Sequence, residues 1–178
     1  MPYQSGTQKG LAAMADKTIS ERLQPSLLDR LTDTEPGVRK EKREERVIDV
    51  RELREIIQRD LGWLLNTNNN ETQIDSERFP NVARSVLNYG VRVVAGDYST
   101  TQRAELIRKS IARAIELYEP RIIEGSTDVE LRTDSSGNDT LISFDIRADM
   151  WAQPLPLELF LRSDVDMITG EVTLERMV

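Results

Sequence analysis

The spacing of apolar residues changes from a helical to a strand period near Pro120, and this change limits the folds open to the chain. Before Pro120, apolar residues recur at spacings of three and four, which is typical of amphipathic helices. After Pro120 they alternate with polar residues, as in strands that bury one face. This order predicts an α+β fold, with N-terminal helices packed on one face of a C-terminal antiparallel β-meander.

Capping residues and apolar stripes indicate where the helices begin and end. A serine, threonine or proline stands at the expected start of most of them, and Pro120 disfavours helix at the residue before it. Glycine is free to adopt a positive φ and closes the third helix. The predicted helices cover residues 26–31, residues 47–65, residues 78–90 from Pro80 to Gly90, and a segment from Ser99 or Thr100 to Glu119.

Alternating apolar residues predict four strands after Pro120. Turn-forming residues separate them, with Ser-Ser-Gly-Asn at 135–138 and Met-Ile-Thr-Gly at 167–170. Trp151 follows the clearest strand, and we expect it to pack at the end of the sheet. The predicted strands hold Val129 and Leu131, residues 142–150, Leu157 to Leu161, and Val172 with Leu174.

Composition separates a polar N-terminal stretch from the rest of the chain. Residues 1–20 are polar and lack a sustained period, so we expect a flexible tail there and a single domain over residues 21–178. The stretch also lacks the apolar run of a signal peptide, and no segment approaches the length of a membrane span. A cytoplasmic protein without direct membrane insertion is expected.

The chain of 178 residues contains no histidine and no cysteine. This absence excludes catalytic triads, thiol nucleophiles, histidine-ligated zinc and disulfides. No glycine-rich phosphate motif is present, and the sequence from Asp164 to Glu175 fits a hairpin better than a calcium loop because its fifth position is Ile168. We therefore expect no enzyme activity, no catalytic residue, no cofactor and no metal. Enzymes that use a carboxylate pair, an oxygen-ligated metal or a Schiff-base lysine remain open, and a glycosidase with two carboxylates is the alternative among them.

Negative charge gathers in the C-terminal part of the sequence. Residues 123–178 hold 12 of the 31 acidic residues but only 4 of the 24 basic residues. Such a surface repels the phosphate backbone, so nucleic acid is not an expected partner.

Glu119, Pro120 and Arg121 stand at the junction between the last helix and the sheet. Proline fixes the exit from the helix, and opposite charges flank it. One interpretation is a local ion pair that caps the helix. The other is a rigid corner that presents a charged pair to a partner protein.

Five segments, in this order and spacing, resemble TssE, the family of small baseplate proteins of the bacterial type VI secretion system. That family is similar to the baseplate wedge proteins of contractile phage tails, long labelled lysozyme-like. The resemblance covers roughly residues 20–178, and Gly62 departs from it where a larger residue is expected. The segments are PSLLDRLTD (25–33), RDLGWLLNT (59–67), SVLNYG (85–90), IELYEPRI (115–122) and LFLRSDVDMITGEVTLE (159–175).

The resemblance implies a structural protein that connects the wedge and hub of the baseplate to the contractile sheath and helps to initiate sheath assembly. It implies TssF, TssG, TssK, the VgrG spike and the TssB–TssC sheath as partners, at the inner face of the cytoplasmic membrane. Baseplate contacts are implied for Glu119, Pro120 and Arg121, and strand exchange with the sheath for the meander. A lysozyme-like peptidoglycan glycosidase and a phage-tail wedge protein are the alternatives.

Overall fold

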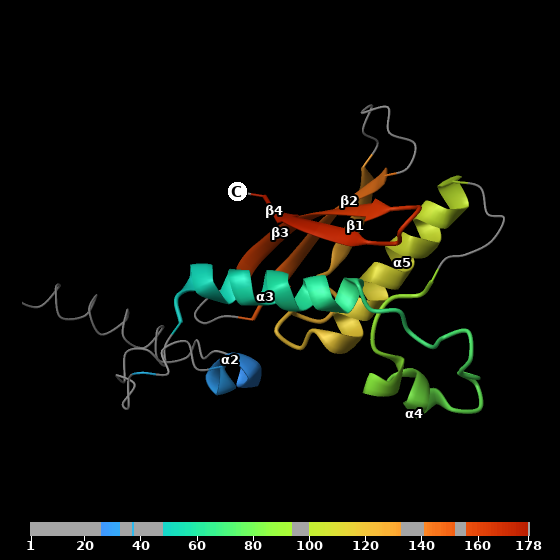
Figure 1. Ribbon diagram of the computed structural model, residues 1–178, viewed down its shortest axis with the longest axis horizontal. Coiled ribbons are helices and arrows are strands. Elements are labelled where there is room, and N and C mark those ends of the chain that lie inside the picture. Colours follow the sequence, from blue (N-terminus) through green and yellow to red (C-terminus); the bar gives the residue numbers. More distant parts are fainter. Residues whose placement is uncertain are drawn as a thin grey trace, which may run out of the picture. The chain divides into compact units, whose positions relative to one another are not determined.

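The computed structural model describes residues 26–32, 37, 48–93, 100–132, 141–151 and 156–177 (Figure 1). The chain divides into two compact units. One contains residues 1–57 and Ala152–Leu155, and the other contains Gln58–Trp151 and Pro156–Val178. The predicted tail lies outside the described residues, so the tail and the single domain over 21–178 stay predictions.

The described part of the first unit is helical. Helix α2 spans Leu27–Leu31, and the Oγ of Ser26 accepts a hydrogen bond from the main-chain N–H of Asp29, which confirms the predicted cap. The next helix, α3, spans Val50–Leu65 and runs on into the second unit. It starts three residues later than predicted because Asp49 caps it, accepting the N–H of Glu52 over 2.7 Å.

The second unit holds the remaining helices and the whole sheet. Helix α3 supplies its residues from Gln58 onward, and the predicted long helix before Pro120 is confirmed. The other elements are α4 (Pro80–Ala83), η2 (Val86–Asn88), α5 (Thr100–Tyr118), β1 (Asp128–Arg132), β2 (Leu141–Met150), β3 (Leu157–Asp166) and β4 (Val172–Arg176).

The single helix predicted over residues 78–90 is wrong, because α4 and η2 are separate short helices. The chain leaves helical geometry at Ser85, whose hydroxyl accepts the N–H of Leu87 and so starts a new turn. The side chain of Asn88 then donates back to the carbonyl of Ala83 over 2.9 Å. These side-chain bonds compete with a continuous helix.

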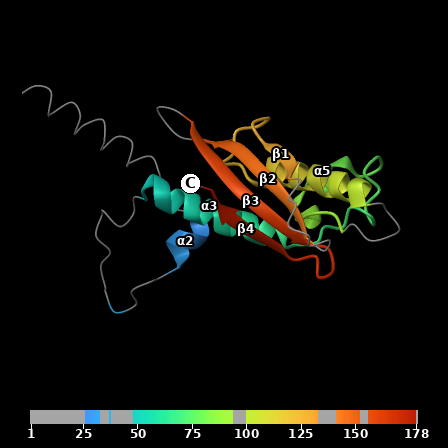
Figure 2. The ribbon, with the colours of Figure 1, turned by 90° about the horizontal axis from the view of Figure 1, so that it is seen from above.

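The four strands form one antiparallel sheet in the order β1-β2-β3-β4, which confirms the predicted meander. Helix α5 and the C-terminal half of α3 lie on one face of this sheet (Figures 1 and 2). Side chains from that face and from the two helices make the core. The most deeply buried are Leu61, Leu65, Ile111, Ile115, Phe144, Ile146, Met150, Leu159 and Leu161.

The opposite face of the sheet carries mostly acidic side chains, as the alternation predicts. Arg162 of β3 is one of the basic residues there, and its Nε lies 3.6 Å from Oδ1 of Asp145 on β2. The expected packing of Trp151 is wrong, since 63% of its surface is exposed. No described helix combines the length and the apolar character that a membrane span needs.

Candidate protein-interaction site

The Glu-Pro-Arg segment is a corner that is fixed at both ends. On the helix side, the N–H of Glu119 donates to the carbonyl of Ile115 over 2.9 Å. On the sheet side, the carbonyl of Arg121 accepts the N–H of Trp151 over 2.7 Å, and Ile122 forms an antiparallel bridge with Met150. The position of Arg121 is therefore set by α5 and β2 together.

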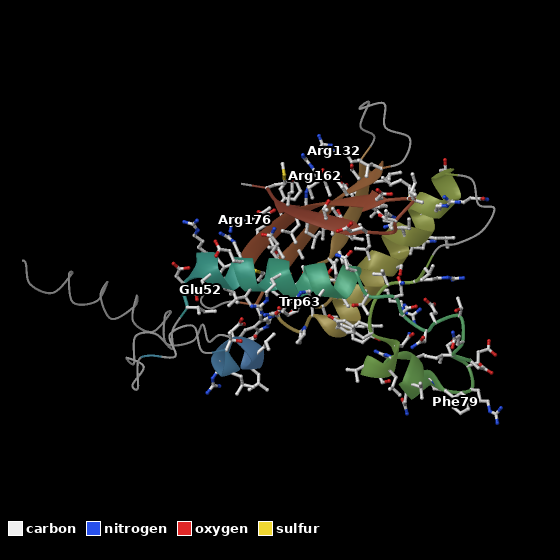
Figure 3. All side chains as sticks on the ribbon, in the orientation of Figure 1. Glu52, Trp63, Phe79, Arg132, Arg162 and Arg176 are labelled. Carbon is white, nitrogen blue, oxygen red and sulfur yellow. The ribbon has the colours of Figure 1, made fainter. Side chains whose placement is uncertain are left out.

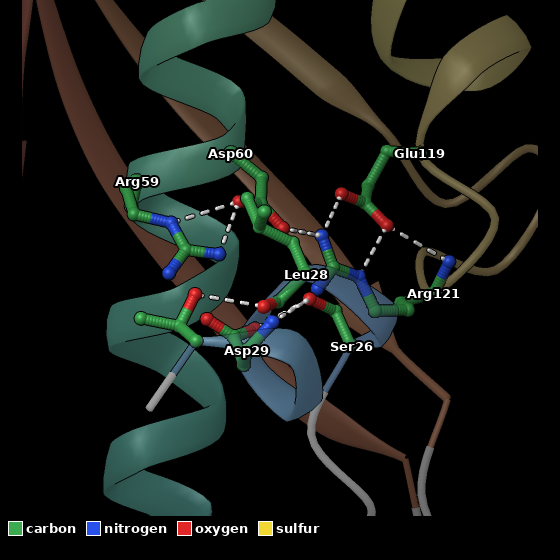
Figure 4. Close-up of polar contacts among 8 residues, drawn as sticks. Ser26, Leu28, Asp29, Arg59, Asp60, Glu119 and Arg121 are labelled. Atoms are coloured by element: carbon green, nitrogen blue, oxygen red, sulfur yellow. Dashed lines mark hydrogen bonds and ion pairs between the residues drawn. The ribbon is translucent and has the colours of Figure 1, made fainter. Parts of the chain in front are cut away.

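Arg121 folds back onto Glu119 and holds its carboxylate with two nitrogens (Figure 4). Its Nε donates to Oε1 over 2.6 Å and its Nη2 donates to Oε2, while the main-chain N–H of Arg121 also donates to Oε1. Glu119 is only 5% exposed. A buried carboxylate needs such a partner, because burial without one is costly. The predicted local ion pair is confirmed.

The same guanidinium reaches a second carboxylate on α3. Nη2 of Arg121 donates to Oδ2 of Asp60 over 2.7 Å. The other oxygen of Asp60, Oδ1, accepts from Nε and Nη2 of Arg59 over 3.0 and 2.7 Å (Figure 4). We call Arg59, Asp60, Glu119 and Arg121 the Arg121 cluster. Its two positive and two negative charges alternate, so every contact between neighbours is attractive.

The electrostatics of the cluster affect two titrating groups. Burial lowers the pKa of Arg121, but the hydrogen bonds and charges of Glu119 and Asp60 outweigh it and raise this pKa above its ordinary value. Burial raises the pKa of Tyr89, and the carboxylates of Asp60 and Glu119 raise it further. Tyr89 therefore lies within the field of the cluster.

Trp63 extends the cluster along the surface of α3. The Cζ atom of Arg59 lies 4.8 Å from the centre of the Trp63 ring, and 51% of Trp63 is exposed. The ring lies on the side of α3 that faces away from the sheet (Figure 3). Tryptophan and arginine are among the residue types that contribute most to protein–protein binding, and here an exposed tryptophan is held against a half-buried arginine.

A second sequence motif, Ser-Val-Leu-Asn-Tyr-Gly, is attached to the same end of α5. The hydroxyl of Tyr118 lies 3.0 and 2.8 Å from the carbonyl oxygens of Ser85 and Asn88. The rings of Tyr118 and Tyr89 meet edge to face, with centroids 5.2 Å apart. Val86 and Leu87 remain 79% and 67% exposed. The motif is thus held rigidly next to Glu119 while it presents two aliphatic side chains.

Gly90, the last residue of this motif, packs against the main chain just after α3. Its φ is +114°, and a Cβ atom there would lie 2.1 Å from the carbonyl oxygen of Thr67. The same oxygen accepts the N–H of Val91 over 2.8 Å. Only glycine permits this close approach. Segments that are far apart in the sequence therefore meet at one end of the second unit.

The sequence prediction named Glu119, Pro120 and Arg121 but did not connect them with Arg59 and Asp60. No periodicity signals an ion pair between two such distant segments. The signal in the sequence was that both segments, 59–67 and 115–122, are among those that resemble the TssE family.

The cluster is not arranged to hold a metal. Each of its carboxylates is held by arginine, and the described residues contain no group of three or more His, Cys, Asp or Glu side chains that could hold a metal.

A family model described as baseplate wedge protein gp25 matches residues 51–155. The matched segment makes up more than half of the chain and contains the whole Arg121 cluster, Trp63 and the Ser-Val-Leu-Asn-Tyr-Gly motif. No curated protein and no solved structure matches the chain.

Proposed function

Because the chain belongs to the baseplate wedge protein gp25 family, we propose that it is a structural, non-enzymatic subunit of a type VI secretion baseplate. In this role it links the baseplate wedge and hub to the contractile sheath and helps to initiate sheath assembly. It works in the cytoplasm, at the inner face of the cytoplasmic membrane. Residues 21–178 act as one wedge domain, preceded by a flexible tail.

The observation that carries this proposal is the Arg121 cluster with the exposed ring of Trp63 beside it. Three arginine–carboxylate contacts fix the geometry of the surface before any partner binds. Preorganised side chains lose little freedom on binding, which favours a fixed position in an assembly. Glu119, Pro120 and Arg121 therefore form the corner that we assign to wedge contacts with TssF, TssG and TssK.

The remaining partners are assigned to the sheet. Its open face carries the acidic excess of the chain, and complementary charge orients partners more than it strengthens binding. We assign the TssB–TssC sheath and the VgrG spike to this acidic face of the sheet. A phage-tail wedge role uses the same surfaces, and the genes next to this one distinguish the two systems: membrane-complex genes for secretion, capsid genes for a phage.

A lysozyme-like activity finds no support in the cluster. A glycosidase needs two carboxylates that face a substrate across open space. Here Nη2 of Arg121 contacts both Asp60 and Glu119, so a guanidinium occupies the position between them. A purified-protein assay of cell-wall turbidity should show no clearing. Clearing that disappears in D60N or E119Q would overturn the structural assignment.

The test of the proposed function is complementation of a strain that lacks this protein. Sheath assembly, followed with a fluorescent sheath subunit, and secretion should be lost with E119A and R121A. They should also be reduced with R59A and W63A, which change exposed parts of the surface and leave the buried Glu119–Arg121 pair intact. Urea unfolding of each purified variant separates loss of contact from loss of fold.

R113A is the matched control. Arg113 lies on α5 and also forms an ion pair, with its Nη1 3.0 Å from Oε1 of Glu71, but its side chain is 48% exposed and outside the cluster. Normal sheath assembly is expected with R113A. If R59A, W63A, E119A and R121A all assemble sheaths as the wild type does, the docking role of the cluster is wrong.

A further inference from the structure

The outer edge of β4 is occupied by side chains from α3. The carbonyl of Glu171 accepts the N–H of Asp166 over 2.9 Å, and the N–H of Met177 donates to the carbonyl of Phe160 over 3.1 Å, so both residues face β3. Because hydrogen-bonding direction alternates along a strand, the main-chain groups of Val172 and Leu174 point away from β3. These are the groups with which a fifth strand would pair.

Asn66 takes the place of a strand residue at Val172. Its Oδ1 accepts the N–H of Val172 over 2.9 Å, and its Nδ2 donates to the carbonyl of Val172 over 2.8 Å. One side-chain amide thus satisfies both main-chain groups, as the peptide group of a neighbouring strand would. Nδ2 also donates to the carbonyl of Gly62 over 2.8 Å, which ties this side chain to the last turn of α3.

Gln58, two turns earlier in the helix, binds the same edge through one hydrogen bond. Its Nε2 donates to the carbonyl of Leu174 over 2.9 Å. Asn66 meets Val172 and Gln58 meets Leu174, so α3 runs antiparallel to β4 along its outer edge. The partners are 106 and 116 positions apart in sequence, and both contacts lie within the second unit.

We propose that Asn66 and Gln58 keep the edge of β4 closed to strand pairing in the free protein. An exposed edge with unpaired main-chain groups is a template for another copy of the same chain. With both amides in place, both main-chain groups of Val172 and the carbonyl of Leu174 are already bonded, so a strand that adds there must first displace Asn66 and Gln58. This inference does not depend on the proposed function.

The experiment compares the full-length wild type with the double variant Q58A/N66A. Hydrogen exchange of single amides, followed by NMR, should be roughly tenfold faster at Val172 in dilute samples of the variant, because this N–H loses its acceptor. Exchange at Thr173 and Glu175, whose main chain pairs with β3, should be unchanged. Faster exchange at Val172, Thr173 and Glu175 together would indicate general unfolding and would overturn the proposal.

Sedimentation velocity then tests the consequence. The variant should form dimers as concentration rises, and the Val172 amide should regain protection in the dimer. Q73A/N81A, which removes two exposed amides away from the sheet edge, should behave as the wild type. Unchanged exchange at Val172, a variant that stays monomeric, or a dimer without renewed protection at Val172 would each overturn the proposal.

Discussion

Arg121 donates a hydrogen bond to Asp60 over 2.7 Å, although 61 positions separate the two residues in the sequence. The bond joins the C-terminal half of α3 to the corner that follows α5. Because the same guanidinium grips the buried carboxylate of Glu119, one side chain holds two segments of the second unit together. The candidate binding surface and the stability of the fold therefore share a residue.

Removal of Arg121 should destabilise the protein more than removal of an exposed arginine. R121A leaves the buried carboxylate of Glu119 without a positive charge and with the main-chain N–H of residue 121 as its remaining donor, and we expect a loss of about 3 kcal/mol in the free energy of unfolding. R113A breaks an exposed pair and should cost less than about 1 kcal/mol. Urea unfolding measures both, and equal losses would show that Glu119 does not depend on Arg121.

The pKa of Tyr89 should respond to Asp60. D60N removes one of the charges that raise this pKa, so it should fall toward 10.0, while burial keeps it above that value. Titration of the tyrosine ring carbons by NMR resolves the residue. A pKa of Tyr89 that is the same in D60N and wild type would contradict the proximity of the two groups.

Stability should also fall at high pH because of the two raised tyrosine pKa values. Burial raises the pKa of Tyr118 as well as that of Tyr89. The folded state keeps both protons at a pH where the unfolded chain loses them. The contribution to stability is therefore complete below the ordinary value of 10.0 and is lost as pH rises through the folded pKa values. Urea midpoints should drop more steeply above pH 10.0 in the wild type than in Y118F.

Replacement of two glycines by alanine should change the stability of the protein in opposite directions. G90A places a Cβ atom against the carbonyl of Thr67 and demands a positive φ, so we expect a loss of about 3 kcal/mol. G62A lies inside α3, and apart from the neighbouring backbone of its own helix no described atom comes within 4 Å of the added Cβ, so it should gain about 1 kcal/mol through helix propensity. Thermal unfolding compares them, and a tolerated G90A would contradict the close packing at Thr67.

Replacement of Ser163 by alanine should stabilise the protein. It is fully buried in β3, and its Oγ has no hydrogen-bond partner among the described residues. An unsatisfied hydroxyl costs about 1 kcal/mol or more, so S163A should raise the unfolding free energy by roughly that amount. A destabilised S163A would show that the hydroxyl has a partner.

Sequence reasoning recovered the parts of the fold that local pattern determines. The stripes of α3 and α5 and the alternation of β2 are long and regular, and the cap at Ser26 is local. It failed over residues 78–90, where hydrogen bonds from Asn88 and Tyr118 divide the expected helix. The bond from Asn88 to Ala83 is local, but the contacts of the Tyr118 hydroxyl with Ser85 and Asn88 are tertiary, and no local pattern contains them.

In the candidate site, too, local contacts could be predicted from the sequence and tertiary contacts could not. Glu119 and Arg121 are two positions apart, so their pairing follows from the sequence. The contact with Asp60 and the closure of the β4 edge by Asn66 depend on how α3 lies against the rest of the second unit.

Direct binding of the purified chain to a purified TssF–TssG complex tests the central claim, that the Arg121 cluster and Trp63 form the docking surface. R59A and W63A should bind at least tenfold more weakly than wild type, which corresponds to about 1.4 kcal/mol, while R113A binds normally. Equal affinity of R59A, W63A and wild type, with each variant folded, would contradict it.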